Sequence, residues 1–133
     1  MNIIKFSILF FLISAPLSSI GACWKLNNIT GYEAFKSDGY KFEKGEFGIE
    51  LTLIINNNSA SVSANGQDSS LKYIPISPTM IIGVYSEGGI STSETFSING
   101  NRVLYAKIVN DNRKNIDMTG AHSMVGDATP CSS

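Results

Sequence analysis

The residue best suited to act as a general base is His122, the single histidine of the 133-residue chain. A histidine base works on a nucleophile that it contacts, and an acidic side chain orients it. Serines are abundant, and Asp117 and Asp127 lie close to His122 in the sequence. However, the Gly-x-Ser-x-Gly pattern of a nucleophile elbow occurs nowhere in the chain. We therefore predict no catalytic residue and expect His122 to make an ordinary hydrogen bond.

Metal binding and acid–base catalysis by carboxylates receive no better support. One histidine and two cysteines cannot make a tetrahedral nitrogen–sulfur site. The triplet 110–112 (Asn-Asp-Asn) offers oxygen ligands, but it lacks the spaced twelve-residue loop of a calcium site and is typical of a turn. Glu43, Glu46 and Glu50 cluster around two glycines, where exposed glutamates are common. The sequence thus predicts no metal, no cofactor and no catalytic carboxylate pair.

Cys23 and Cys131 are the two cysteines of the chain and lie near the ends of the expected mature domain. An even cysteine count in an exported protein favours pairing. Closing a loop of about a hundred residues would stabilise the fold by about 4–5 kcal/mol in the chain-entropy model. A second interpretation is lipidation of Cys23, because residues 20–23 (Ile-Gly-Ala-Cys) resemble the bacterial lipobox. Lipidation would leave Cys131 as an odd thiol, so we favour the disulfide over an acylated Cys23 and over two free thiols.

Residues 1–22 have the order of a secretory signal peptide. Lys5 supplies a positive charge, residues 6–13 form an apolar core, and small residues follow before the expected cleavage site. The apolar run of about a dozen residues is shorter than the ~20 that a transmembrane helix needs. We therefore expect one exported domain over residues 23–133, either periplasmic or secreted. Acylation of Cys23 would instead make the protein a membrane-anchored lipoprotein.

The charge pattern argues against a nucleic-acid partner. Once the leader with its single lysine is removed, nine basic residues face eleven acidic ones. The basic residues are scattered singly except for Arg113 and Lys114, whereas a polyanion-binding surface needs them clustered. No later stretch is long and apolar enough to span a membrane as a helix.

Apolar and polar residues alternate with a period of two along most of the mature chain, as in residues 49–55 and 60–64. Turn sequences such as Asn65-Gly66 separate the alternating segments. About eight strands joined by short turns predict an all-β antiparallel meander that closes into a barrel, with a β-sandwich as the alternative. Residues 80–85 lack polar alternation, so we expect a strand covered on both faces. Residues 32–36 are expected to form an irregular loop or a single helical turn.

Aromatic residues concentrate at the start of the mature chain, and Tyr32 and Phe35 lie in its least regular segment. Loops often carry function, and aromatic side chains anchor protein contacts, so these two residues form the candidate binding surface. We expect a small exported binding module that contacts another protein, as an inhibitor, an immunity protein or a host-directed factor would. The alternatives are a lipocalin-like carrier of a small apolar ligand in a barrel cavity and a hydrolase, which the residues support least.

Overall fold

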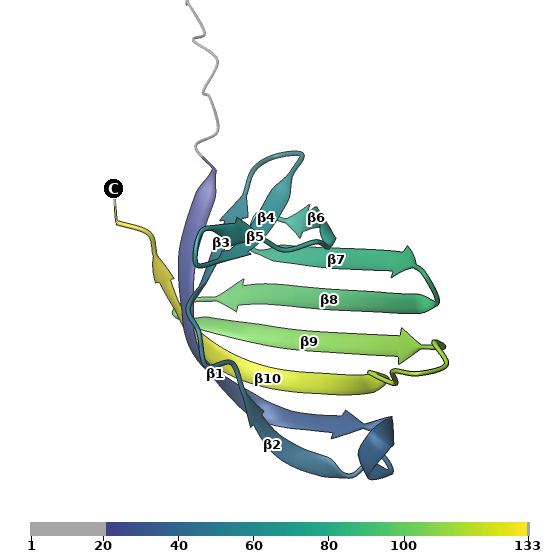
Figure 1. Ribbon diagram of the computed structural model, residues 1–133. Helices are drawn as coiled ribbons and strands as arrows, with labels where there is room; N and C mark the ends of the chain where they lie inside the picture. Colours follow the sequence, from purple (N-terminus) through teal and green to yellow (C-terminus); the bar gives the residue numbers. More distant parts are fainter. Residues whose placement is uncertain (1–20, 133) are drawn as a thin grey trace, which may run out of the picture.

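The computed structural model describes residues 21–132, which form ten antiparallel strands and one 3₁₀ turn (Figure 1). The predicted signal peptide, residues 1–22, therefore falls almost entirely outside the described residues. The elements in chain order are β1 (Ala22–Phe35), η1 (Lys36–Asp38), β2 (Phe42–Glu46), β3 (Leu51–Ile55), β4 (Ala60–Ala64), β5 (Gln67–Asp68), β6 (Lys72–Ser77), β7 (Met80–Glu87), β8 (Ile90–Asn99), β9 (Arg102–Asp111) and β10 (Gly120–Pro130).

Eight of these strands close a barrel in the order β1-β3-β4-β6-β7-β8-β9-β10, because β10 pairs with β1. The strands of the ring follow one another in chain order, with β2 and β5 as the two interruptions, as expected for a meander. The two remaining strands lie outside the ring: β2 pairs with β1, and β5 pairs with β4. The predicted barrel of about eight strands is confirmed, in preference to a β-sandwich.

Strand β1 is long because it serves two neighbours on one side. Its first half, Ala22 to Leu26, pairs with β3, and its second half, Thr30 to Ala34, pairs with β2. Asn28 separates the halves with a φ of 52° and interrupts the register with β10. This bulge changes the alternation, so that Leu26 and Ile29 both point into the core. The predicted loop or helical turn at residues 32–36 is wrong, since strand pairing on both sides extends β1 to Phe35.

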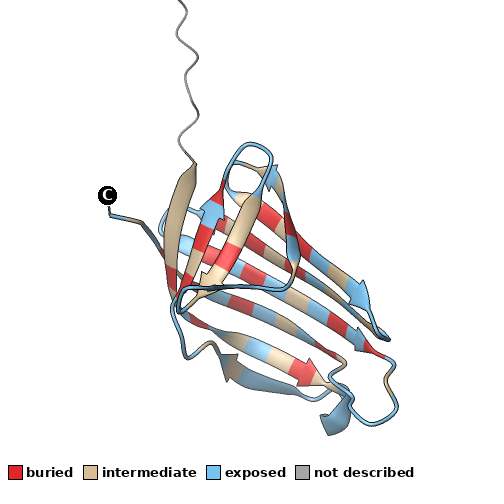
Figure 2. Ribbon diagram, turned by 45° about the horizontal axis from the view of Figure 1, so that its top comes forward, coloured by how far each residue is buried: buried red, intermediate tan, exposed pale blue. Residues whose placement is uncertain are grey.

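The core fills the barrel at the end where the first half of β1 meets β3. Along β8, β9 and β10 buried and exposed residues alternate, as Figure 2 shows in red and pale blue. Leu26, Leu53 and Phe96 are among the residues almost completely removed from solvent. The expectation that β7 is covered on both faces is wrong, because Val84 is 45% exposed. The buried residues of β7 are Ile81 and Gly83, which point into the barrel.

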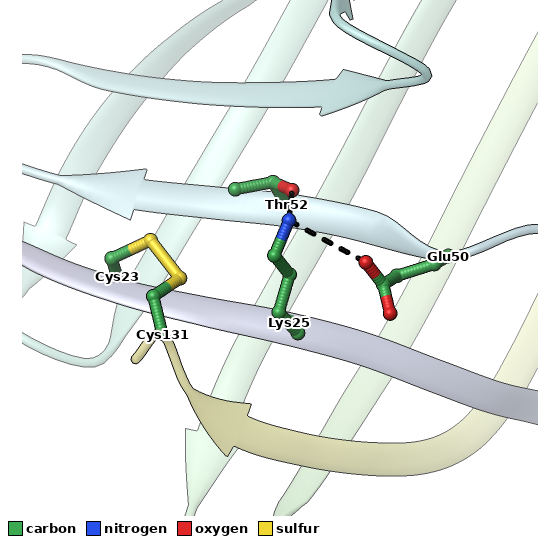
Figure 3. The surroundings of a disulfide bond; sticks show 5 residues. All are labelled: Cys23, Lys25, Glu50, Thr52 and Cys131. Atoms are coloured by element: carbon green, nitrogen blue, oxygen red, sulfur yellow. Dashed lines mark hydrogen bonds and ion pairs between the residues drawn. A yellow bond between two sulfur atoms is a disulfide. The ribbon is translucent and has the colours of Figure 1, made fainter. Parts of the chain in front are cut away.

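The disulfide between Cys23 and Cys131 joins the start of β1 to the residue that follows β10 (Figure 3). The two Cα atoms lie 5.4 Å apart, and the Cys131 amide donates a hydrogen bond to the Cys23 carbonyl at 3.0 Å. The bond therefore lies on the seam where the barrel closes, as predicted. Cys23 in this bond has no thiol to acylate. Beside it, Lys25 donates to Thr52 and pairs with Glu50 across the outside of β1 and β3.

Candidate functional site

Five ionisable residues form a continuous line along one face of five adjacent strands, four of them in the ring and the fifth, β2, beside it. Strand register pairs Glu94 with Lys107, Lys107 with His122, His122 with Glu33, and Glu33 with Glu43. We call these five residues the charged row. The next inward positions toward the disulfide end are apolar or glycine, for example Phe96, Tyr105 and Met124. The charged row therefore lies at the boundary between the packed core and the opposite end of the barrel.

Glu94 is the most buried member of the charged row, with 7% of its surface exposed. The Tyr73 hydroxyl donates to its Oε1, the Tyr105 hydroxyl donates to its Oε2 at 2.7 Å, and Lys107 Nζ lies 3.9 Å from Oε2. Burial, reinforced by the adjacent Glu94, raises the pKa of both phenols well above their usual value. Gly83 leaves room for Tyr73, because a Cβ there would overlap its ring. The two tyrosines therefore stay protonated and act as donors to the carboxylate.

His122 contacts a glutamate, not the serine and aspartate that a hydrolase would need. Its Nδ1 lies 3.2 Å from Glu33 Oε2, and its ring packs edge-on against Phe35. Burial lowers the pKa of His122, with a further contribution from Lys107, and these effects outweigh the opposite influence of Glu33. Within residues 21–132, no serine or aspartate side chain hydrogen-bonds to His122. The contact with Glu33 is the polar contact that His122 makes here, and its lack of a catalytic role stays a prediction.

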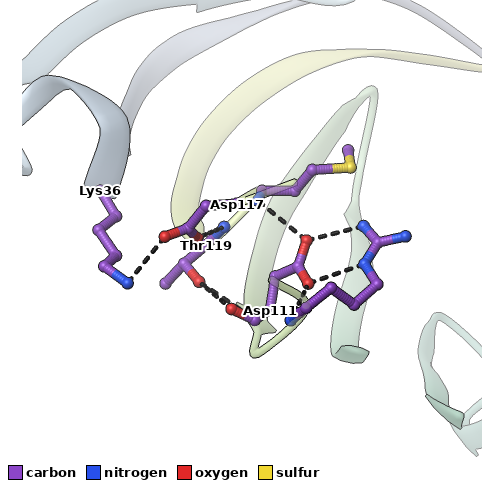
Figure 4. Close-up of polar contacts among 6 residues, drawn as sticks. Lys36, Asp111, Asp117 and Thr119 are labelled. Atoms are coloured by element: carbon purple, nitrogen blue, oxygen red, sulfur yellow. Dashed lines mark hydrogen bonds and ion pairs between the residues drawn. The ribbon is translucent and has the colours of Figure 1, made fainter. Parts of the chain in front are cut away.

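The two aspartates near His122 in sequence serve other contacts. Asp117 pairs with Lys36 of η1 at 2.7 Å and caps the amide of Thr119 (Figure 4). Asp127 pairs with Arg102 of the neighbouring strand at 2.6 Å. Across the described part of the chain, no group of three or more histidine, cysteine, aspartate or glutamate side chains is arranged to hold a metal ion.

A third aspartate, Asp111, organises the loop between β9 and β10. Its carboxylate, completely buried, accepts hydrogen bonds from the Arg113 guanidinium at 2.7 and 2.8 Å and from the amides of Arg113 and Met118 (Figure 4). The Arg113 hydrogen bonds hold the pKa of Asp111 well below its usual value, with burial opposing them. Thr119 Oγ1 also accepts a hydrogen bond from the Asp111 amide at 2.9 Å. The triplet 110–112, considered above as a calcium ligand set, is thus the start of an internally bonded turn.

The outer faces of five adjacent strands carry no charged side chain in their central part. Register places side by side three outward residues from each of β7, β8, β9, β10 and β1. We call this surface the uncharged face. Its residues are Met80, Ile82, Val84, Ser93, Thr95, Ser97, Leu104, Ala106, Ile108, Ala121, Ser123, Val125, Thr30, Tyr32 and Ala34.

Charged residues begin only at the margins of the uncharged face. The Arg102–Asp127 ion pair borders it near the disulfide end, and Lys44 and Glu46 of β2 border it laterally. Phe42, also on β2, extends the face by pairing with Ala34 and is 74% exposed. The surface therefore has an apolar and hydroxyl-bearing centre with a charged rim.

The two residues predicted as a binding surface lie on opposite faces of β1. Tyr32 points outward within the uncharged face and is 55% exposed. Phe35 points inward, is half-buried, and packs against His122 of the charged row. Sequence reasoning missed Phe42. It also missed the uncharged face, although the absence of charge at alternate positions of residues 104–108 and 121–125 is visible in the sequence.

No helix within residues 21–132 is long and apolar enough to cross a bilayer. In comparisons with known proteins, no family model, no curated protein and no solved structure matches the chain significantly.

Proposed function

We propose that this protein is a non-catalytic binding module that docks another protein on the uncharged face, with Tyr32 and Phe42 as anchors. The observation that carries the proposal is the row of outward positions without charge, which spans five strands and ends at two exposed aromatic side chains. An inhibitor, an immunity protein or a host-directed factor would use a rigid scaffold of this kind.

The composition of the surface supports a protein partner. Protein interfaces are depleted of charge and enriched in aromatic residues at their centre, and they have a polar rim. Here Leu104, Ile108 and Val125 are exposed among small and hydroxyl-bearing residues, while the charged pairs stand at the margin. Soluble monomers rarely expose a large contiguous apolar surface, and such a surface often marks an interaction site.

The filled barrel interior argues against a carrier of a large apolar ligand. Phe96, Leu26 and Leu53 occupy the region where a lipocalin-like cavity would lie. The disulfide supports a location outside the reducing cytosol, in the periplasm or the medium, because such bonds persist in oxidising compartments.

The proposal is tested with three variants of the purified, disulfide-bonded domain: Tyr32→Glu, Phe42→Ser and the control Ile54→Ser. Ile54 is also exposed but lies on β3, where it pairs with Cys23 at the disulfide end of β1 and outside the uncharged face. A partner is first identified from the native exported fraction by cross-linking to the wild type, then purified and titrated. We expect Tyr32→Glu to weaken binding by about thirtyfold or more, as loss of an interface anchor does, and Ile54→Ser to leave it unchanged.

Two results would overturn the proposal. The first is a partner whose affinity is the same for Tyr32→Glu, Phe42→Ser and wild type. The second is self-association of the wild type, abolished by Tyr32→Glu, which would make a second copy of the chain the occupant of the uncharged face. Sedimentation of the wild type and Tyr32→Glu at several concentrations detects the second result.

A further inference from the structure

The barrel has its fewest paired residues between β4 and β6, and a pocket of about 280 Å³ opens beside this junction. The two strands share a single register pair, Ala60 with Tyr73. The chain between these two strands forms β5, which pairs with β4 and not with β6. Inward residues of β3, β4, β6 and β8 therefore line a space that reaches from the β4–β6 junction into the barrel.

The inner end of this pocket is Glu94, the buried member of the charged row. Its two oxygens have different surroundings. Oε2 accepts from Tyr105 and lies near Lys107, whereas Oε1 accepts a hydrogen bond from Tyr73 alone among the described residues. A carboxylate oxygen can accept two hydrogen bonds, so Oε1 retains acceptor capacity. The Ser69 hydroxyl hydrogen-bonds with the Tyr73 hydroxyl at 3.2 Å and helps to hold the phenol in place.

The walls of the pocket are apolar, and its charged lining is of one sign. Phe47, Leu51, Val62 and Phe96 supply the walls. Asp68 adds a second carboxylate near the opening, and among the described lining residues there is no lysine or arginine. Lys107, 3.9 Å from Glu94 Oε2, offsets part of the Glu94 charge from outside the pocket, and Asp68 has no ion-pair partner among the described residues. The lining therefore keeps a net negative charge that favours a bound cation, while Glu94 Oε1 supplies the free acceptor site.

We infer that this pocket binds a small organic ammonium ion that carries an apolar group. The ammonium donates to Glu94 Oε1, and the apolar group lies against Phe47 and Phe96. The pocket volume of about 280 Å³ lies just below the usual range for small-molecule sites, about 300–1,000 Å³, which restricts the ligand to a compact amine.

The same chemistry occurs in a free amine and in a lysine side chain of a partner protein. The test therefore uses phenethylamine as the free amine and Nα-acetyl-lysine methylamide as the lysine side chain. The uncharged analogue 2-phenylethanol is the matched control, since it has nearly the same shape and lacks the ammonium. Binding is followed by ¹H–¹⁵N spectra of the whole oxidised domain, in which the amides of β4, β5 and β8 report on the pocket.

We expect one of the two amines to bind with an affinity at least about tenfold higher than 2-phenylethanol, because a charge-assisted hydrogen bond to a buried carboxylate is the distinguishing contact. Tighter binding of the lysine derivative would identify the source as a protein side chain. Equal binding of phenethylamine and 2-phenylethanol, or no binding of either amine at millimolar concentration, would overturn the inference.

Two variants locate the site. Glu94→Gln keeps the shape of the side chain and removes its charge, so it should weaken amine binding about tenfold or more. Since this variant changes a buried network, Ala64→Phe provides a second route: it fills the pocket, keeps Glu94, and should also abolish binding. Asp38→Asn, on the distant 3₁₀ turn, should bind as the wild type does. Undiminished binding by folded Ala64→Phe would refute the site, whereas Tyr32→Glu, which tests the uncharged face, should leave amine binding intact.

Discussion

At the scale of single residues, the carboxylate of Glu94 is buried and depends on hydrogen bonds from two phenols. Glu94 retains its position because Tyr73 and Tyr105 replace the water that it loses on folding. The cost of leaving such a group with too few donors is larger than the gain from a typical hydrogen bond. The two tyrosines are therefore structural residues, whether or not the pocket is occupied.

The first prediction concerns the Tyr105 hydroxyl. Tyr105→Phe removes one donor from Glu94 and should lower the free energy of unfolding by about 1–3 kcal/mol, measured by urea denaturation. Tyr40→Phe, which removes an exposed hydroxyl, is the control and should change it by less than about 0.5 kcal/mol. Equal stability of the two variants would contradict the account of Glu94.

The second prediction concerns His122 and pH. The pKa of His122 is lowered in the folded protein from its ordinary value of 6.5, so the unfolded chain binds the proton more readily. Stability should therefore fall as the pH is lowered from about 6.5 through the folded pKa. The groups that face the imidazole are Glu33 on β1, Lys107 on β9 and, beyond it, Glu94 on β8.

Urea denaturation between pH 7 and pH 5 measures this effect. His122→Asn should show a flatter dependence than the wild type in that interval. The depressed pKa values of Asp111 and Asp117 add a separate loss of stability only below about their ordinary value of 3.8, so the two intervals can be distinguished. An identical slope in the two proteins between pH 7 and pH 5 would show that the imidazole does not control it.

Among the elements, the loop between β9 and β10 offers the third prediction. Asp111→Asn removes the charge that the Arg113 guanidinium contacts and should free residues 112–119, with amide exchange at Met118 about tenfold faster or more. Asp117→Asn breaks only the exposed ion pair with Lys36 and should have a much smaller effect. If both variants exchange alike, the buried carboxylate is not what orders the loop.

The elements also show what could be predicted from the sequence. Strands with undisturbed alternation, such as β3 and β4, were identified because a period of two places every second side chain against the core. The second half of β1 was missed because the bulge at Asn28 interrupts its alternation. Its pairing with β10 joins Tyr32 to Ser123, and no local pattern records a contact between residues so far apart in the chain.

The same limit applies to the candidate sites. Charge-free alternate positions within one strand are visible in the sequence, but only the register of five strands turns them into one surface. The charged row likewise takes its five residues from five different strands, and closure of the ring pairs Glu33 of β1 with His122 of β10. The cysteines were the exception, because their parity and position at the chain ends predicted the bond without knowledge of register.

At the scale of the whole molecule, barrel closure separates two surfaces of different chemistry. The central outward positions of β7 to β10 and β1 have no charge, whereas the inward positions at the end away from the disulfide include the charged row. A ligand in the pocket and a partner on the uncharged face would therefore contact opposite sides of the barrel wall, with β8 as the strand that both share. Both depend on the ring staying closed.

The last prediction concerns the covalent closure of the ring. Cys23 and Cys131 are 108 residues apart, and a loop of this size lowers the entropy of the unfolded chain by an amount worth about 4–5 kcal/mol at most. Since a domain of this size has a total stability of about 5–15 kcal/mol, the Cys23→Ser/Cys131→Ser variant should lose a large part of its urea resistance. Adding dithiothreitol should lower the midpoint of the wild type to that of the variant and leave the variant unchanged. A wild-type midpoint that resists full reduction of the bond would mean that the strand pairing of β1 with β10 closes the barrel without help from the disulfide.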